Sequence, residues 1–261
     1  MLTQPIATNN ATDIFTSLDP QAIALLFDVD GTLIDIGPSP FEVDVPDELR
    51  ASLVRLYELT EGALALVSGR PIVDLDRLFM PLKLPMIGGH GAEMRLHDGK
   101  VFYSAGDLPD AMRSLLADVA TPESGIVAEN KGYSVALHYR KAPKEAERLR
   151  KLIAAVRAAF PQEATELLLG KAMFEVKRPG VDKGYSVREL MKRPPFLGRV
   201  PVFIGDDVTD ESVFKVLPDL GGKSFSVRRH FPDLIGIFDS AAEVRNALKI
   251  LASRGPDGPA A

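Results

Sequence analysis

The sequence contains no cysteine among its 261 residues, which excludes disulfides, thiolate nucleophiles and thiolate metal sites. Its first lysine or arginine is Arg50, so we expect no secretory signal peptide, because such a peptide needs a basic segment near its start. No apolar run is long enough to cross a bilayer, and we expect no membrane segment. A cytoplasmic location is therefore the expectation.

The sequence also has fewer positively than negatively charged side chains. The chain has 31 Lys and Arg against 36 Asp and Glu, which gives a formal net charge of -5. Binding to nucleic acid rests on many Lys and Arg contacts to phosphates, so we expect no nucleic-acid partner. An anionic substrate would need a local cluster of positive groups or a metal ion.

Short apolar segments alternate with helical patterns at both ends of the chain. Residues 22–27 and 63–67 are continuous apolar runs, which is typical of strands buried on both faces, and the leucines between 46 and 60 follow helical spacing. The alternation returns after residue 180, with an apolar run at 200–204. It predicts an α/β fold with a doubly wound, Rossmann-like parallel sheet.

The middle of the chain has a different pattern. Residues 93–103 predict a hairpin, 132–140 alternate in hydrophobicity, and 142–160 predict an amphipathic helix. Hairpins with helices indicate an α+β domain inserted into the core. We place this inserted domain at 97–178 and the core at 1–96 and 179–261. Residues 1–20 are expected to form an irregular arm.

The first predicted strand ends in an acidic pair, within Phe27-Asp28-Val29-Asp30-Gly31-Thr32-Leu33. Alternate residues of an extended segment point to opposite sides, so the two carboxylates can serve one site only if the chain bends, which Gly31 permits. Acids at the carboxyl end of a parallel strand lie where open α/β sheets bind ligands. The alternative is a polar turn with surface aspartates.

A second acidic motif, Gly205-Asp206-Asp207-Val208-Thr209-Asp210-Glu211, also follows an apolar strand. Helix capping by Thr209 is the alternative interpretation, but it leaves Asp206 and Asp207 at the strand end unexplained. Four acids in so short a stretch repel one another unless a cation lies among them. Hard oxygen ligands beside a phosphate suit magnesium.

Two further motifs contribute groups that bind anions. Ser68-Gly69-Arg70 follows the second predicted strand, where a hydroxyl and the N–H groups of a helix start can hold a phosphate oxygen. Lys183 begins a predicted helix, where its charge opposes the helix dipole, and this favours a nearby anion. The alternatives are a common Ser-Gly turn and a solvated surface lysine.

In this order the four motifs resemble those of the haloacid dehalogenase-like (HAD) superfamily of phosphatases, whose nucleophile is an aspartate. The resemblance implies that Asp28 is the nucleophile and Asp30 the general acid–base. It implies phosphoryl binding by three residues, namely Ser68, Gly69 and Lys183, with Lys183 also catalytic. It implies Mg²⁺ held by Asp28, the backbone carbonyl of Asp30, and Asp206, with Asp207 and Asp210 supporting these ligands.

Further segments resemble the trehalose-6-phosphate phosphatase family, namely 89–93 in the core and 129–134, 138–140 and 174–177 in the inserted cap. The resemblance implies hydrolysis of trehalose 6-phosphate, the last step of trehalose biosynthesis, with a trehalose-6-phosphate synthase as functional partner. It implies that six polar residues bind the sugar: His90, Glu93, Glu129, Lys131, Ser134 and Glu175.

Several alternatives stay open on the sequence alone. Taken singly, each residue of the cap is also consistent with an ordinary surface or strand position, and His138 is expected to be structural. The second choice of substrate is another sugar phosphate, such as sucrose phosphate or mannosylglycerate phosphate. A phosphomutase uses the same core. A non-catalytic regulatory subunit is disfavoured because Asp28 and Asp30 are both present.

Overall fold

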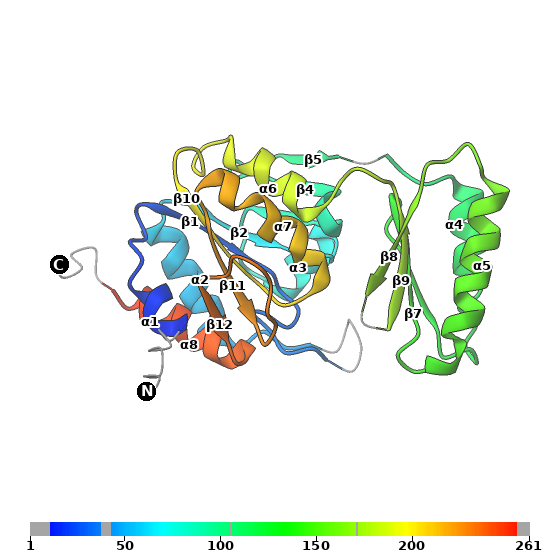
Figure 1. The fold of residues 1–261 in the computed structure, drawn as a ribbon, viewed down its shortest axis with the longest axis horizontal. Coiled ribbons are helices and arrows are strands. Elements are labelled where there is room, and N and C mark those ends of the chain that lie inside the picture. The colour runs from blue at the N-terminus through cyan, green and yellow to red at the C-terminus, as the bar shows by residue number, and fades with distance from the viewer. Residues whose placement is uncertain (1–10, 38–42, 105, 171, 255–261) are drawn as a thin grey trace, which may run out of the picture. The chain divides into compact units, whose positions relative to one another are not determined.

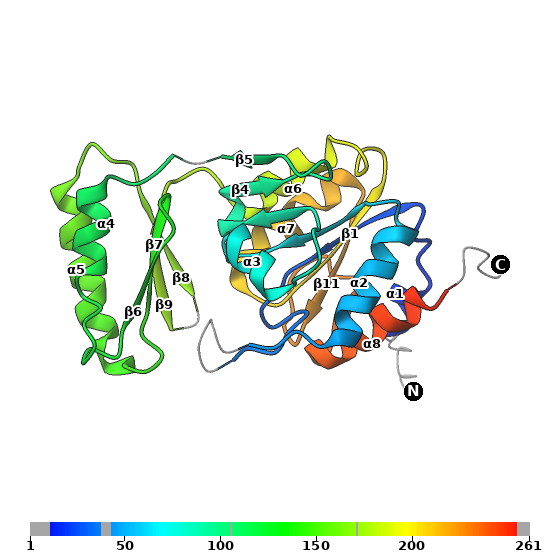
Figure 2. The ribbon, with the colours of Figure 1, turned by 180° about the vertical axis from the view of Figure 1, so that it is seen from behind.

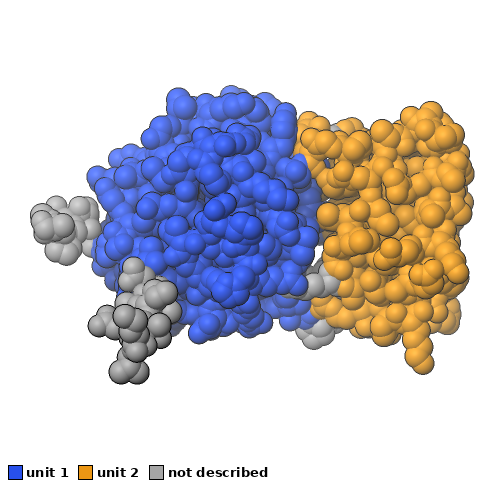
Figure 3. Space-filling model, in the orientation of Figure 1, with its two compact units in different colours: residues 1–102, 182–261 blue, residues 103–181 orange. Residues whose placement is uncertain are grey.

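The structure is a computed structural model that describes residues 11–37, 43–104, 106–170 and 172–254. It contains two compact units, of which unit 1 comprises residues 1–102 with 182–261 and unit 2 comprises 103–181 (Figure 3). The sequence places the inserted domain at 97–178, whereas unit 2 begins at Tyr103 and ends at Val181. Within the described ranges, no helix is long and apolar enough to span a membrane.

Unit 1 is built on an eight-stranded sheet with the order β12-β11-β10-β1-β2-β3-β4-β5 (Figure 1). Its strands are β1 (Ile23–Phe27), β2 (Leu64–Val67), β3 (Met86–Gly88), β4 (Glu93–Arg95), β5 (Val101–Tyr103), β10 (Val200–Gly205), β11 (Lys223–Val227) and β12 (Gly236–Phe238). Strands β12 to β3 are parallel, and β4 is antiparallel to β3. The strand order reverses between β1 and β10, and open α/β sheets bind ligands at the carboxyl ends beside such a reversal.

Helices cover both faces of this sheet (Figure 2). They are α1 (Ala11–Thr16), α2 (Asp47–Leu59), α3 (Ile72–Leu78), α6 (Lys183–Met191), α7 (Glu211–Val216) and α8 (Ala241–Ala252), with short 3-10 turns η1 (Gly89–Gly91), η3 (Val208–Asp210) and η4 (Pro218–Leu220). On β1, Leu25 and Phe27 pack with α1, α2, α3 and α8, whereas Ala24 and Leu26 pack with α6 and α7. Both faces of β1 are buried, which explains its unbroken apolar run and confirms the doubly wound core.

The expected irregular arm over 1–20 is wrong within the described residues, because 11–16 form α1. Residues 1–10 lie outside the described ranges. Ala11 and Phe15 are one helical turn apart, and both are buried in the core beside α8. The Phe15 ring meets the Phe225 ring edge-on, with 5.7 Å between centroids. Tertiary packing therefore supports a helix too short to show a periodic pattern in the sequence.

Unit 2 contains a four-stranded antiparallel sheet with the order β6-β7-β9-β8. Its elements are α4 (Asp110–Ala117), β6 (Val127–Asn130), β7 (Ser134–His138), η2 (Pro143–Glu145), α5 (Ala146–Ala159), β8 (Glu166–Gly170) and β9 (Met173–Lys177). One face of the sheet, with Val135, Leu137 and Val176, packs on α4 and α5 in a core of its own. The polar residues Ser134 and Glu175 alternate with these and share the other face.

Candidate active site

The two acidic motifs meet at the carboxyl ends of the central strands β1 and β10. Phe27 is paired with Ile204, and the next residue, Asp28, donates its backbone N–H to the Ile204 carbonyl at 2.9 Å. This ladder places the acids at 28 and 206 side by side. The sequence predicted both strand ends, and the pairing of β1 with β10 brings them into one site.

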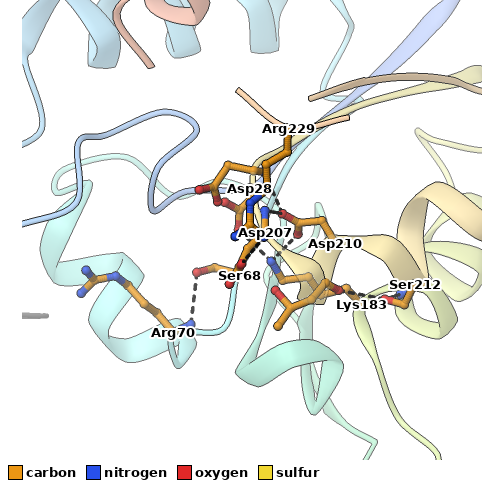
Figure 4. Close-up of polar contacts among 11 residues, drawn as sticks. Asp28, Ser68, Arg70, Lys183, Asp207, Asp210, Ser212 and Arg229 are labelled. Atoms are coloured by element: carbon orange, nitrogen blue, oxygen red, sulfur yellow. Dashed lines mark hydrogen bonds and ion pairs between the residues drawn. The ribbon is translucent and has the colours of Figure 1, made fainter. Parts of the chain in front are cut away.

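A buried lysine joins the two motifs (Figure 4). The Lys183 Nζ donates to Asp28 Oδ1 at 2.7 Å and to Asp210 Oδ1 at 2.6 Å. Lys183 begins α6, where Asp182 caps the helix by accepting the Tyr185 N–H at 2.8 Å. The lysine is only 2% exposed, so the alternative of a solvated surface lysine is wrong.

These ionisable groups change each other's proton affinity. Burial, and next the negative charge of Asp210, raise the pKa of Asp28 well above its ordinary value, although Lys183 opposes them. Burial alone would lower the pKa of Lys183, but Asp210 and Asp28 outweigh it and raise that pKa. The lysine is therefore firmly cationic, and its positive charge faces more than one carboxylate.

The cluster has the donor set of a site for a hard cation. Oxygens of Asp28, Asp206 and Asp210 lie within 4.8 Å of one another, and all three residues are buried. A Cβ on Gly31 would lie 2.4 Å from Asp206 Oδ2, so the glycine, with φ of +91°, is what allows this close approach. Three carboxylates around one ammonium leave excess negative charge, which a divalent cation would offset.

Asp210 is engaged on both of its oxygens. Its Oδ1 accepts from Lys183, and its Oδ2 accepts the backbone N–H groups of Asp206 at 2.9 Å and Asp207 at 3.0 Å. A Cβ on Gly205 would lie 2.6 Å from this oxygen. Asp207 forms an ion pair with Arg229 at 3.2 Å. Asp210 thus organises the loop that carries Asp206, in keeping with a supporting role.

Asp30 points its carboxylate at a different partner. Arg70 Nε donates to Asp30 Oδ2 at 2.7 Å and Arg70 Nη2 to Asp30 Oδ1 at 2.6 Å, which is a two-pronged ion pair. The Arg70 backbone N–H also donates to Ser68 Oγ at 3.1 Å. Ser68 is buried at the end of β2, and Arg70 therefore links the predicted phosphate-binding turn to the predicted acid–base.

The two predicted sugar residues of unit 1 lie next to that turn. His90 is buried in η1 at a φ of 54°, and a Cβ on Gly69 would lie 2.4 Å from the His90 ring. Glu93 Oε2 accepts the N–H of Ile72, at the start of α3, at 2.6 Å. Glu93 thus caps a helix. Its role in sugar binding stays a prediction.

The four predicted sugar residues of unit 2 form one cluster. Glu175 Oε1 accepts from Ser134 Oγ at 2.6 Å and from Lys131 Nζ at 3.2 Å, and Glu129 Oε2 lies 3.9 Å from the same Nζ. Ser134 and Glu175 are both 0% exposed. The alternatives of a solvent-facing serine and an ordinary strand charge are therefore wrong.

Comparison with known proteins decides the family. A sequence profile of the trehalose-phosphatase family matches residues 26–255. The chain belongs to this family. The trehalose-6-phosphate phosphatase of Escherichia coli (strain K12) is 43% identical over 208 residues, which are 78% of this chain and 77% of that protein. A probable trehalose-phosphate phosphatase of Sinorhizobium fredii is 39% identical over 241 residues, 90% of each chain.

Solved structures of the trehalose-phosphatase type share the fold. A trehalose-6-phosphate phosphatase related protein superposes with a TM-score of 0.69 at 25% identity, over 87% of this chain and 96% of the other. The C-terminal domain of the C. albicans trehalose-6-phosphate phosphatase gives 0.75 at 21% identity, over 95% and 99%. These findings confirm the resemblance given above.

Two residues of this trehalose-phosphatase family member have contacts that sequence reasoning did not assign. Arg70 directly follows Ser68-Gly69, a place that allowed it to pair with acids of the site, and the structure shows that its partner is Asp30. His138, which the sequence favoured as structural rather than catalytic, contacts Glu129, with 3.2 Å between His138 Nε2 and Glu129 Oε2. Arg70 is 40 positions from Asp30 in the sequence, and Glu129 and His138 are diagonal neighbours on adjacent strands. Only the structure therefore shows these two pairs.

Proposed function

We propose that the chain hydrolyses trehalose 6-phosphate to trehalose and inorganic phosphate, the last step of trehalose biosynthesis. The observation that carries the proposal is the match of residues 26–255 to the trehalose-phosphatase family. The matched residues include Asp28 and Lys183, whose side chains are in buried contact. Two relatives that are 43% and 39% identical bear the name of this activity, which supports the same substrate.

In the proposed reaction, Asp28 is the nucleophile and Asp30 is the general acid–base. A carboxylate oxygen of Asp28 attacks phosphorus, the bond from phosphorus to the sugar oxygen breaks, and Asp30 donates a proton to that oxygen. Water then attacks the phosphorus of the aspartyl-phosphate, and Asp30 accepts the proton of the water. The bond to Asp28 breaks, so inorganic phosphate leaves and the nucleophile is restored.

Other groups of unit 1 would hold the phosphoryl group. Lys183, held between Asp28 and Asp210, would offset the charge of the phosphoryl oxygens. Ser68 Oγ and the N–H of Gly69 would bind one of these oxygens at the end of β2. Arg70 holds Asp30 as a carboxylate through two hydrogen bonds, so Asp30 must leave this pair and take up a proton before it acts as the acid.

Mg²⁺ is the proposed cofactor, and the residues suit it. Asp28, Asp206 and the backbone carbonyl of Asp30 would hold it, while Asp210 and Asp207 fix the loop that carries Asp206. Grouped carboxylate oxygens are the ligands that this ion prefers. When bound, the ion supplies positive charge that polarises the phosphoryl oxygens and lowers the repulsion between phosphate and nucleophile.

Selectivity for the sugar is proposed to come from residues of both units. His90 and Glu93 would contribute from unit 1. In unit 2, Glu129, Lys131 and Glu175 would bind sugar hydroxyls, and Ser134 would hold Glu175 in place. A disaccharide offers many hydroxyls, so its site needs several fixed donors and acceptors. The substrate must be supplied by a glycosyl transfer that yields trehalose 6-phosphate, which makes a synthase the functional partner.

The test is phosphate release from a panel of sugar phosphates in the presence of Mg²⁺. The panel contains trehalose 6-phosphate, sucrose 6-phosphate, glucose 6-phosphate and mannosylglycerate phosphate. We expect the largest kcat/KM with trehalose 6-phosphate. A preference for another member would retain the Asp28 chemistry and refute the sugar assignment, and no release by folded protein would refute the activity.

A further inference from the structure

The polar face of the unit 2 sheet has an ordered set of side chains. Glu129 on β6 pairs with Ala136 on β7, and Ala136 pairs with Glu175 on β9. The two carboxylates therefore flank a residue with only a methyl side chain. His138 is two residues beyond Ala136 on the same face, so it is the diagonal neighbour of Glu129, within reach of a long side chain.

The structure shows that His138 uses this reach. Its Nε2 lies 3.2 Å from Glu129 Oε2. Burial would raise the pKa of Glu129, but the hydrogen bond from His138 and the charge of Lys131 outweigh it and hold that pKa below its ordinary value. Glu129 is therefore ionised at neutral pH and can only accept. The hydrogen of this bond must belong to His138 Nε2.

Glu129 is thus held from two sides, by the imidazole N–H and by the ammonium of Lys131 at 3.9 Å. The two donors differ, because Lys131 is closer to Glu175, at 3.2 Å, and is shared by both carboxylates. If His138 is removed, Glu129 loses the hydrogen bond that opposes the attraction of Lys131. The Glu129 carboxylate then turns toward the ammonium, and the direction in which it accepts a hydrogen bond changes.

We propose that His138 is a positioning residue for selectivity: it holds the Glu129 carboxylate in the orientation that accepts hydrogen bonds from the sugar of the substrate. The inference rests on the proposed function, because it assigns Glu129 to the sugar. His138 belongs to unit 2, whereas the motifs proposed to carry the reaction belong to unit 1. Its removal therefore weakens binding of the sugar phosphate and leaves the chemistry of unit 1 intact.

The experiment compares His138→Ala with the unchanged protein on two substrates, trehalose 6-phosphate and p-nitrophenyl phosphate. We expect KM for trehalose 6-phosphate to rise about tenfold, the scale of a hydrogen bond to a charged group, with kcat nearly unchanged. Turnover of p-nitrophenyl phosphate, which has no sugar, stays the same. His138→Gln keeps an N–H donor, so we expect it to recover most of the affinity that His138→Ala loses. A role in filling space alone would not depend on a donor.

The matched control is Val127→Ala, because Val127 is paired with His138 in β6 and is on the same face without a polar group. It leaves both substrates unaffected. Thermal unfolding of each variant confirms that the protein is folded, and His138→Leu, which fills the space without a donor, replaces His138→Ala if that variant does not fold. Equal losses on both substrates, an unchanged KM in His138→Ala, or no recovery in His138→Gln would overturn the inference.

Failure of the proposed function has a different signature. If the unchanged protein does not prefer trehalose 6-phosphate to p-nitrophenyl phosphate, the sugar assignment of Glu129 is wrong, and the inference is lost with it. If the unchanged protein prefers the sugar phosphate and His138→Ala retains that preference in full, only the role of His138 is refuted.

Discussion

Each unit of the molecule has a lysine whose side chain is at most 5% exposed and lies between two carboxylates, but the distances in the two arrangements differ. In unit 1, Lys183 lies 2.7 Å from Asp28 and 2.6 Å from Asp210. In unit 2, Lys131 lies 3.2 Å from one carboxylate and 3.9 Å from the other. Backbone N–H groups also fix Asp210, whereas in unit 2 the neighbouring contacts come from side chains.

The difference indicates different tasks. Backbone and strand ends fix the first cluster, as a reacting centre needs, because small displacements are costly there. The second cluster lies on one face of a sheet, and its lysine is farther from the carboxylates than Lys183 is from its partners. Hydroxyl groups of a sugar can replace these longer contacts with hydrogen bonds of their own. The predictions below test this division between chemistry in unit 1 and selectivity in unit 2.

The largest expected effect is the loss of Mg²⁺. Excess chelator should abolish turnover of both trehalose 6-phosphate and p-nitrophenyl phosphate, and added Mg²⁺ should restore it. The reason is that the three carboxylates beside Lys183 carry excess negative charge when no metal ion is bound. Calorimetric titration of the metal-free protein with Mg²⁺ gives an independent readout, in which Asp206→Asn should bind at least about tenfold more weakly. Full activity in chelator would refute the metal role.

Removal of the lysine from each cluster sharpens the comparison. Lys183→Ala leaves Asp28 and Asp210 buried without their cation, which should cost about 3–5 kcal/mol of unfolding free energy and stop turnover of both substrates. Lys131→Ala should cost less, about 1–3 kcal/mol, because its contacts are longer. Chemical denaturation measures both. A greater loss of stability in Lys131→Ala would contradict the difference in tightness.

A selective loss is expected when two residues of the unit 2 cluster are changed together. Lys131→Ala with Glu175→Ala removes both members of one ion pair, so neither charge is left buried alone. We expect kcat/KM for trehalose 6-phosphate to fall about a hundredfold, the scale of two polar contacts, while p-nitrophenyl phosphate turnover changes little. Equal loss on both substrates would contradict a sugar site in unit 2.

The smallest effect is expected for Ser134→Ala. The change removes the 2.6 Å hydrogen bond to Glu175 but leaves Lys131 as a donor to the same oxygen. We expect a loss of about 1 kcal/mol in unfolding free energy and a small rise in KM for trehalose 6-phosphate. Ser253→Ala, at the exposed C-cap of α8, is the control, and an equal effect there would show that the Glu175 contact is unimportant.

Much of unit 1 could be predicted from the sequence because its signals are local. Each motif directly follows an apolar strand or begins a helix, and parallel strands bring such ends to one edge of a sheet. The ion pair of Arg70 with Asp30 could not be assigned, because it spans 40 positions and depends on how β1 and β2 direct their loops.

Unit 2 was harder to predict because its contacts depend on register. The diagonal pair of Glu129 and His138 exists only if β6 and β7 align with Glu129 opposite Ala136. A shift of one residue would move either side chain to the apolar face. No periodic pattern indicated α1, since its stability comes from Phe15, which packs in the core between the sheet and α8.

The most direct test of the central claim is phosphate release from trehalose 6-phosphate, with Mg²⁺, by the unchanged protein and by Asp28→Asn. The two side chains have nearly the same shape, and thermal unfolding checks that the variant is folded. The account predicts steady release by the unchanged protein and none above background by Asp28→Asn. Near-normal release by a folded Asp28→Asn would contradict it, because the amide cannot serve as the carboxylate nucleophile.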